Sequence, residues 1–457
     1  MRSADWRVIC IAASSRDDLA DVSYPIGPLR AGFEPMPTGD AYASPRRMRE
    51  VNGMSKSRLV IWGAMALTVA APAPAAGLSE RDRAAIAAME EGPPTRPSAD
   101  PVKPSPKLVD RMAALKVPAV SVAYLENGQV RWARAYGRAA AGEERSVTPE
   151  TRFQAASMSK AVTAAGALRF VDEGRLALDQ DVNARLRAWR VPEGGLDSAG
   201  QKVTLRRLLS HTAGLSLGGY PGYPAGVAVP TIAQSLRGEP PSNTPAVRPV
   251  DAPGTKFSYS GAGYSVAQLL MTETAGTGFA QLMRRSVLRP AGMTRSSFGQ
   301  PLPPDARRGS ASGHDPDGRT VPGGSYIYPE QAAAGLWTTP SDYARFLIAL
   351  QASWMGKPGA LLKPETAKAM MTPVLATSGL GVNVIRRGDR TAVVHGGNNE
   401  GFRCQFVMFL DGAREGAVVM TNGENGAMLL GDILQALEAS YGWAPRPARP
   451  APTQGGD

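Results

Sequence analysis

Two stretches early in the chain and four near its end have the hydrophobic pattern of β-strands. Residues 120–125 and 130–136 alternate at period two, and Asn127-Gly128 lies between them. This dipeptide is a preferred centre of a two-residue hairpin turn, so the pattern predicts a β-hairpin. The later strand-type stretches are residues 382–386, 391–395, 404–410 and 416–420.

Between these two sets of strands the pattern changes to helical periods and loops. Helices are predicted at residues 107–116, 161–170, 205–210, 231–237, 263–277, 279–288 and 340–351, with a terminal helix at about 427–441. An early hairpin, a long helical insertion and late strands place the first and last segments in one antiparallel sheet. The expected fold class is therefore α+β, with a mainly helical inserted domain and a cleft at the junction.

The same pattern divides the chain into parts. Residues 107–442 are expected to form the folded domain, in which residues 107–155 and about 352–442 supply the sheet and about 175–351 the helices. Residues 77–106 are predicted to be a helix followed by a Pro-rich linker, and residues 443–457 a disordered tail.

Residues 54–76 are organised like a secretory signal peptide. A short basic region at residues 54–58 precedes the apolar residues 59–71, and Ala73-Pro74-Ala75 supplies an A-x-A cleavage motif. The apolar run is too short to span a membrane, and no cysteine directly follows it to carry a lipid. We expect translation to start at Met54, with residues 1–53 a non-structural extension. Cleavage at about Ala75/Ala76 would give a periplasmic or secreted protein without a stable membrane anchor.

The basic excess of the chain is not that of a nucleic-acid-binding protein. The formal net charge is +11, but the basic residues are scattered, without a dense block or interleaved aromatic residues. Of two cysteines, Cys10 falls in the extension, which leaves Cys404. A single cysteine excludes a disulfide framework and a cysteine-based zinc site, and we expect Cys404 to be a small buried apolar residue.

Candidate chemistry is concentrated in the stretch Phe153-Gln154-Ala155-Ala156-Ser157-Met158-Ser159-Lys160. If a helix begins near Ser157, then Ser157 and Lys160 share one face. The hydroxyl then lies at a helix N-terminus that favours negative charge, and Lys160 can take its proton if burial lowers the pKa of the amine. This S-x-x-K arrangement occurs in serine hydrolases, although a capping serine with a surface lysine is the common alternative.

Two further stretches offer polar groups at loop or strand ends. Tyr259, in a Ser/Gly loop before a helix, can project into a cleft and act as a base beside Lys160; the alternative is a half-buried structural tyrosine. The run His395-Gly396-Gly397-Asn398 ends a strand, where the glycines permit close approach and the Asn398 N–H is a donor. A surface position is the alternative for His395. His211, in a Leu-Ser-His-Thr-Ala-Gly-Leu stretch, is expected to be a hydrogen-bonded structural histidine.

Together these stretches resemble the serine β-lactamase and penicillin-binding protein superfamily, above all its class C β-lactamase, D-stereospecific peptidase and family VIII carboxylesterase branch. The order is the same: S-x-x-K, the Leu-Ser-His stretch, a tyrosine loop and an H-x-G strand. Residues 334–342 are similar to the segment that begins a helix late in the family's helical domain. The likeness covers about residues 107–442.

The resemblance implies a role for each residue. Ser157 would be the acylated nucleophile, Lys160 and Tyr259 would share proton transfer, and His395 would stand where many relatives carry lysine. The implied substrate-binding groups are the backbone N–H groups of Ser157 and Asn398, which would form the oxyanion hole, with Gly396, Gly397 and Gly261. No metal and no organic cofactor is implied.

Two departures from the family's pattern bear on the substrate. The tyrosine motif usually reads Y-x-N in amide-cleaving β-lactamases, whereas Gly261 occupies the third position here. His395 replaces a permanently charged residue that would hold a β-lactam carboxylate, and with an ordinary pKa near ~6.5 it is largely neutral at pH 7. Both changes favour ester or peptide-like substrates over efficient β-lactam hydrolysis.

The sequence therefore predicts an exported, cofactor-free serine hydrolase that acts on a small-molecule ester, amide or β-lactam. A class C-type β-lactamase, a D-stereospecific peptidase or penicillin-binding protein, and a binding protein without turnover remain alternatives. The Gly/Pro-rich segment with Tyr220, Tyr223 and Pro224 is the predicted rim that selects the acyl group. Ser216, in Gly214-Leu215-Ser216-Leu217-Gly218, matches a G-x-S-x-G elbow but lacks the strand and helix that such an elbow needs.

Overall fold

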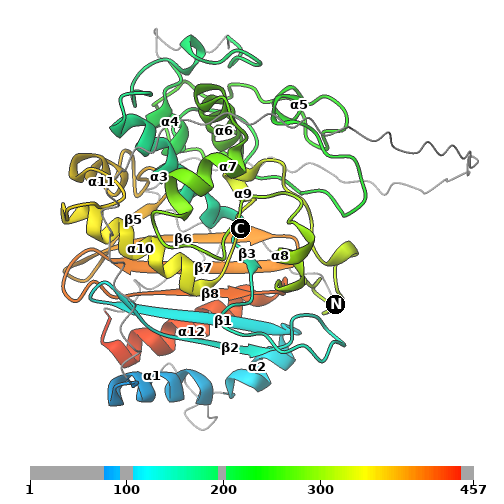
Figure 1. The fold of residues 1–457 in the computed structure, drawn as a ribbon, viewed down its shortest axis with the longest axis vertical. Helices are drawn as coiled ribbons and strands as arrows, with labels where there is room; N and C mark the ends of the chain where they lie inside the picture. Colours follow the sequence, from blue (N-terminus) through cyan, green and yellow to red (C-terminus); the bar gives the residue numbers. More distant parts are fainter. Residues whose placement is uncertain (1–76, 93–105, 194–201, 444–457) are drawn as a thin grey trace, which may run out of the picture. The chain divides into compact units, whose positions relative to one another are not determined.

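The computed structural model describes residues 77–92, 106–193 and 202–443 (Figure 1). The predicted extension, signal peptide, Pro-rich linker and tail lie almost wholly outside these ranges. Helix α1 (Glu80–Glu91) confirms the helix predicted before the linker. No helix in the described ranges is long and apolar enough to cross a membrane.

A six-stranded antiparallel sheet organises the fold, in the order β2-β1-β8-β7-β6-β5 (Figure 1). Strand β1 pairs with β8 from Val120↔Thr421 to Leu125↔Gly416, so the first and last segments share one sheet as predicted. The strands are β1 (Ala119–Glu126), β2 (Gln129–Gly137), β5 (Asn383–Arg387), β6 (Arg390–Asn399), β7 (Phe402–Phe409) and β8 (Gly416–Thr421).

The turn between β1 and β2 confirms the predicted hairpin. Glu126 pairs with Gln129, and the two residues between them, Asn127 and Gly128, have φ values of 51° and 78°. Two positive φ angles in succession match the right-handed twist of the flanking strands, and Asn and Gly adopt them at little cost.

The period-two pattern of β1 separates two hydrophobic cores. Val120, Val122 and Tyr124 pack on one face of the sheet, in a core shared with α1, α2 (Leu108–Ala114) and α12 (Gly426–Tyr441). Ala123 and Leu125 point to the opposite face, in the core shared with the helical region. The helices of the first core appear in the lower part of Figure 1 and those of the second in its upper part.

Helix α3 (Ser159–Asp172) runs through the second core and is buried on almost every side. A helix that is apolar around most of its circumference is stable only inside a large domain, which explains its Ala-rich sequence. Helices α6 (Gly261–Ala275), α9 (Gln331–Ala334) and α11 (Pro364–Met370) and the turn η3 (Arg284–Leu288) pack against it. The other elements of this region are α4 (Leu205–Leu209), α5 (Ile232–Arg237), α7 (Phe279–Met283), α8 (Pro304–Arg308) and α10 (Pro340–Trp354), with a small two-stranded sheet of β3 (Phe153–Gln154) and β4 (Trp337–Thr338).

One predicted boundary was wrong in a way that matters for function. Strand β6 continues to Asn399 instead of ending at His395, because β7 pairs with it as far as Asn399↔Phe402. The helix expected to begin near Ser157 is confirmed: Ser157 lies in a single 3-10 turn, η1 (Ala156–Met158), that continues directly into α3 at Ser159.

Candidate active site

Ser157 lies in the tight turn that leads into α3. The preceding residue, Ala156, has a φ of 51°, a left-handed conformation that a non-glycine residue adopts only when its surroundings impose it. Hydrogen bonds hold the chain before and after Ser157. The Ala155 N–H donates to the Leu336 carbonyl at 2.8 Å, the Tyr343 hydroxyl donates to the Met158 carbonyl at 2.9 Å, and the Leu336 N–H donates to the Ser159 hydroxyl at 3.1 Å. The turn is therefore fixed from α10 and from the loop before β4.

Lys160 meets Ser157 across one turn, as the S-x-x-K spacing predicted. The Lys160 Nζ lies 3.0 Å from the Ser157 Oγ and also donates to the carbonyl oxygen of Ala333, on α9, at 2.8 Å. Only 2% of Lys160 is exposed, whereas Ser157 is half-buried. A buried amine thus lies within hydrogen-bonding distance of a hydroxyl that substrate can reach.

Tyr259 joins this pair from the loop before α6. The Lys160 Nζ lies 5.1 Å from the centroid of the Tyr259 ring. The next residue, Ser260, caps α6 by accepting a hydrogen bond from the Gly263 N–H at 3.1 Å. The cap fixes the chain directly after the tyrosine and keeps its ring beside the lysine.

His211 supports the tyrosine loop from beneath. Its ring stacks on that of Tyr259 with a centroid distance of 4.2 Å, and its Nδ1 accepts a hydrogen bond from the Ser260 N–H at 3.1 Å. Burial and the nearby Lys160 hold the pKa of His211 well below its ordinary value, so the ring is neutral. The prediction of a hydrogen-bonded histidine is confirmed, and its position is directly behind the candidate site.

His395 reaches the same cluster from the sheet. The pairing of β6 with β5 ends at Asn383↔Val394, while its pairing with β7 continues, so residues 395–399 present one strand edge that β5 does not cover. His395 is 5% exposed and its ring centroid lies 6.4 Å from that of Tyr259. The surface alternative is therefore wrong. Burial, and secondarily Lys160, lowers the pKa of His395 to about 4.

Gly397 packs against the backbone of the Ser157 turn. A Cβ placed on Gly397 would lie 2.5 Å from the Ala155 carbonyl oxygen, 2.6 Å from the Cys404 Sγ and 2.9 Å from the Ser157 nitrogen. Such distances are too short for real contacts, so only glycine fits. Cys404 is buried beneath it, as predicted, and its Sγ donates to the Ala155 carbonyl at 3.1 Å.

The alternation of β6 directs the Asn398 N–H to the uncovered edge. The Thr391 carbonyl oxygen accepts a hydrogen bond from the Leu410 N–H, next to β7, so the backbone groups of Thr391 face β7. The preceding residue of β6, Arg390, pairs with Arg387 and faces β5. Hydrogen-bonding directions alternate along an antiparallel strand, so Asn398, like Arg390, points away from β7. Beyond Val394 that side carries no strand, and Asn398 is exposed there.

Gly261 leaves no empty space where a larger residue would have its side chain. A Cβ on Gly261 would lie 3.2 Å from both the Gly218 carbonyl oxygen and the Tyr220 Cε2. The Tyr220 hydroxyl is 2.6 Å from the hydroxyl of Ser265, one turn further along α6. The Tyr220 ring therefore lies along this helix between Gly261 and Ser265 and occupies that space.

Tyr223, predicted to form the rim of the site together with Tyr220, is instead buried within the Gly/Pro-rich segment. It is 3% exposed, its hydroxyl accepts a hydrogen bond from the Asn243 N–H at 3.0 Å, and its backbone pairs with Ile327. These contacts make Tyr223 a residue that holds the loop together, while the half-buried Tyr220 alone of the two remains a candidate for contact with substrate.

Ser216 does not lie on a strand-turn-helix elbow. Its N–H donates to the Arg248 carbonyl and its hydroxyl accepts from the Arg248 N–H, both at 2.9 Å. The hydroxyl thus supports a loop-to-loop contact.

Several contacts around Ser157 could not be predicted from the amino-acid sequence. The Asn399 side-chain amide donates to the Gln154 Oε1 at 2.6 Å and to the Ala334 carbonyl at 3.1 Å, which joins the end of β6 to β3 and α9. Gln154 lies shortly before the S-x-x-K motif and Asn399 directly follows Asn398, but nothing in their spacing along the chain pairs them. The Ala333 carbonyl that binds Lys160 is a backbone group and has no side-chain signature.

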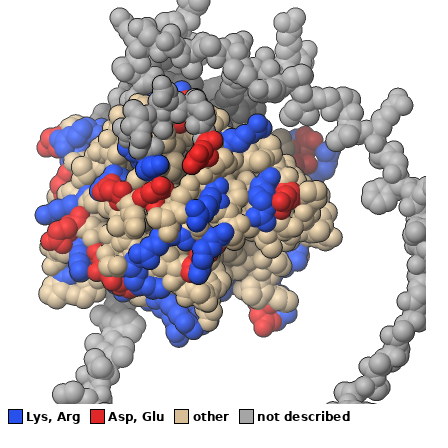
Figure 2. Space-filling model, turned by 90° about the horizontal axis from the view of Figure 1, so that it is seen from above, with Lys and Arg blue, Asp and Glu red and all other residues tan. Residues whose placement is uncertain are grey.

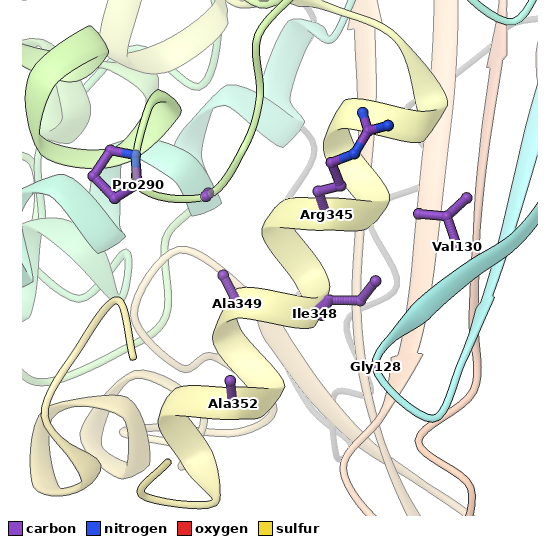
Figure 3. Close-up of a pocket in the computed structure, with 8 residues that line it drawn as sticks. Gly128, Val130, Pro290, Arg345, Ile348, Ala349 and Ala352 are labelled. Atoms are coloured by element: carbon purple, nitrogen blue, oxygen red, sulfur yellow. The ribbon is translucent and has the colours of Figure 1, made fainter. Parts of the chain in front are cut away.

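Two features lie apart from this cluster. A cavity of about 390 Å³ between α10 and the β1–β2 turn is lined by mostly apolar residues, with Arg345 at one side and none of the candidate residues (Figure 3). On the face shown in Figure 2, basic and acidic side chains are interspersed. The described ranges contain no group of three or more His, Cys, Asp or Glu residues arranged to hold a metal ion.

The amino-acid sequence is similar to those of known proteins. The Beta-lactamase family model matches residues 106–440. Protein flp from Staphylococcus aureus (strain N315) is 25% identical over 230 residues, which make up 50% of this chain and 42% of flp. The chain thus spans less than half the length of that relative.

Solved structures show the same fold at low sequence identity. The octameric penicillin-binding protein homologue from Pyrococcus abyssi is 23% identical, with a TM-score of 0.58 over 73% of this chain and 78% of that one. A D-amino acid amidase from Ochrobactrum anthropi SV3 is 18% identical, with a TM-score of 0.57 over 78% of this chain and 98% of that one. The expected α+β fold, with one antiparallel sheet and a helical region, is confirmed.

Proposed function

The chain belongs to the Beta-lactamase family, and on that basis we propose that it is a serine hydrolase that forms an acyl-enzyme on Ser157. The observation that carries the proposal is the 3.0 Å contact between the Ser157 Oγ and the buried Lys160 Nζ. A hydroxyl on a constrained turn, held against a buried amine and beside a tyrosine, is a nucleophile with its proton acceptors in place.

In the proposed reaction, the Ser157 Oγ attacks the substrate carbonyl and its proton passes to the Lys160–Tyr259 pair. The pair returns the proton to the leaving group as the acyl-enzyme forms. A water molecule then attacks the ester carbonyl, and the same pair takes the proton of the water and restores the Ser157 hydroxyl.

The developing oxyanion would be bound by two backbone N–H groups, those of Ser157 and Asn398. The fit of Gly397 against the Ser157 turn supports this, since it brings the uncovered edge of β6 beside the nucleophile. Removal of one such donor typically costs ~10²–10³ in rate.

We propose esters as the preferred substrates. Gly261 offers no side chain, and the Tyr220 ring occupies the space beside it, so this wall presents an aromatic surface in place of an amide. His395 is neutral, which removes the fixed positive charge that would attract a carboxylate.

Amides of D-amino acids are the second candidate class, because a D-amino acid amidase shares the fold. A β-lactam substrate and a binder that is acylated without turnover are weaker candidates. We also propose that the protein is exported, on the strength of the signal-peptide pattern at residues 54–76; N-terminal sequencing of the mature protein tests this.

The test of the proposed function is hydrolysis of p-nitrophenyl butyrate and a chromogenic cephalosporin by the wild type and Ser157→Ala, between pH 5 and 9. We expect ester hydrolysis that is lost in Ser157→Ala, with little cephalosporin turnover. Fast cephalosporin turnover would replace the ester assignment by a β-lactamase, and ester hydrolysis that survives in Ser157→Ala would overturn the mechanism.

A further inference from the structure

The hydrogen bond made by His395 fixes which of its nitrogens carries a proton. The Nδ1 lies 2.6 Å from the carbonyl oxygen of Gly396, the next residue along β6. A carbonyl oxygen only accepts hydrogen bonds, so Nδ1 must be the protonated nitrogen. The imidazole is held in one orientation and in one tautomer by the strand that carries it.

The second nitrogen of His395 therefore carries a lone pair. Burial and the neighbouring Lys160 oppose a second proton and lower the pKa of the ring to about 4. Among the described residues, Nε2 has no hydrogen-bond partner. His395 thus brings a neutral acceptor to the cluster, where a lysine would bring a cationic donor.

The other two histidines of the chain show that this arrangement is specific. In His211 the Nδ1 accepts a hydrogen bond from the Ser260 N–H, so its proton is on Nε2. In His314 the Nδ1 lies 2.7 Å from the Asn422 carbonyl and the Nε2 accepts from the Ala141 N–H at 2.9 Å, so both nitrogens are occupied by the protein. His395 alone of the three has an acceptor nitrogen not taken by another described residue.

We propose that the Nε2 of His395 accepts a hydrogen bond from a hydroxyl or N–H group of the substrate, so that the site selects substrates with an uncharged donor there and disfavours a carboxylate. The His395 ring lies 6.4 Å from that of Tyr259, and the next residues of its strand form the uncovered edge beside Ser157. A molecule bonded to Ser157 and lying along this edge passes the imidazole. The inference rests on the proposed function and names its substrate class.

A lone pair and a carboxylate repel each other, and neither can donate. A substrate hydroxyl in the same place makes a hydrogen bond that a methyl group cannot make. We expect each of these differences to change kcat/KM by about tenfold, the effect of one hydrogen bond made or left unsatisfied.

The test compares three butyrate esters whose leaving phenols differ only at the meta position: hydroxymethyl, methyl and carboxylate. With the full-length wild type we expect kcat/KM to fall in that order. In His395→Lys the carboxylate should become the best of the three, and in His395→Phe the advantage of hydroxymethyl over methyl should disappear. Equal rates for the three esters, or a wild-type preference for the carboxylate, would overturn the inference.

A second measurement needs neither activity nor a variant. Selective ¹⁵N labelling of histidine should give, at pH 7, two rings protonated on Nδ1 (His314 and His395) and one on Nε2 (His211). An imidazolium or an Nε2-protonated tautomer at His395 would contradict the inference. If no ester is hydrolysed although the tautomers are as expected, the proposed function fails. If hydrolysis depends on Ser157 but the three esters react at equal rates, only the substrate class fails.

Discussion

Gly397 is in direct contact with the turn that carries Ser157, so closely that a Cβ on Gly397 would lie 2.9 Å from the Ser157 nitrogen. This contact joins two segments about 240 residues apart in the chain, the start of α3 and the uncovered part of β6. It sets the separation between the candidate nucleophile and the N–H of Asn398.

The first prediction concerns this contact. In Gly397→Ala the added methyl group must push β6 away from Ser157, and we expect kcat/KM for an ester to fall by about 10²-fold or more, as when an oxyanion donor is lost. Gly431→Ala, on α12 and outside the candidate site, is the control, since its Cβ would meet nothing within 4 Å. Equal losses in the two variants would show that the fit at Gly397 is unimportant.

The second prediction concerns the wall of the site. In Gly261→Asn the new side chain competes with the Tyr220 ring and the Gly218 carbonyl for one space, so we expect lower ester activity and no gain in cephalosporin hydrolysis. Tyr220→Ala should create room, so the double variant should be more active than Gly261→Asn alone. Steady-state rates of Gly261→Asn, Tyr220→Ala and the double variant test this rescue. Strictly additive losses in the double variant would contradict a shared space.

The third prediction concerns the support of Tyr259. His211→Ala removes both the stacked ring and the acceptor for the Ser260 N–H, so we expect kcat to fall by about 10²-fold with little change in KM, the consequence of a misplaced group. His211→Asn should recover part of the loss, because asparagine tolerates the φ of 57° and can accept a hydrogen bond. A pure loss of thermal stability, with normal kcat in the folded protein, would contradict a positioning role.

The fourth prediction concerns stability at low pH. All three histidines have a pKa below the ordinary value of 6.5 in the folded protein, with burial as the main cause. Below pH 6.5 the unfolded chain therefore binds more protons than the folded one, and each histidine lowers the free energy of unfolding by up to about 1.4 kcal/mol per pH unit. The stabilisation is complete above pH 6.5 and is lost as the pH falls toward the folded pKa values.

His314 isolates this effect because its two partners, the Asn422 carbonyl and the Ala141 N–H, can also be satisfied by the amide of His314→Gln. Urea unfolding at pH 7.5 and pH 5.0 should show a smaller decrease in the variant than in the wild type. Identical decreases would mean that His314 does not contribute.

The fold was predictable where local pattern and tertiary structure agree. The alternation at residues 120–125 and the Asn127-Gly128 turn report directly on a β-hairpin, and the S-x-x-K spacing brings Ser157 and Lys160 together in any helical turn. The extension of β6 to Asn399 was not predictable, because Gly396 and Gly397 are poor strand formers that are held in the sheet by pairing with β7.

Much of the candidate site depends on groups that leave no trace in a sequence. The Ala333 carbonyl that binds Lys160 belongs to the backbone, and the left-handed φ of Ala156 is imposed by its surroundings. Gly261 could be identified as a missing side chain, but only the fold shows that Tyr220 takes the space, since the two are 41 positions apart and meet through a loop.

The most direct test of the central proposal is to find which atom becomes acylated. The protein is quenched in acid during turnover of a slowly deacylating ester, and the adduct is located by mass spectrometry of its peptides. We predict one acyl group on Ser157, absent from Ser157→Ala. An adduct on Ser216 or another residue, with Ser157 unmodified during turnover, would contradict the account.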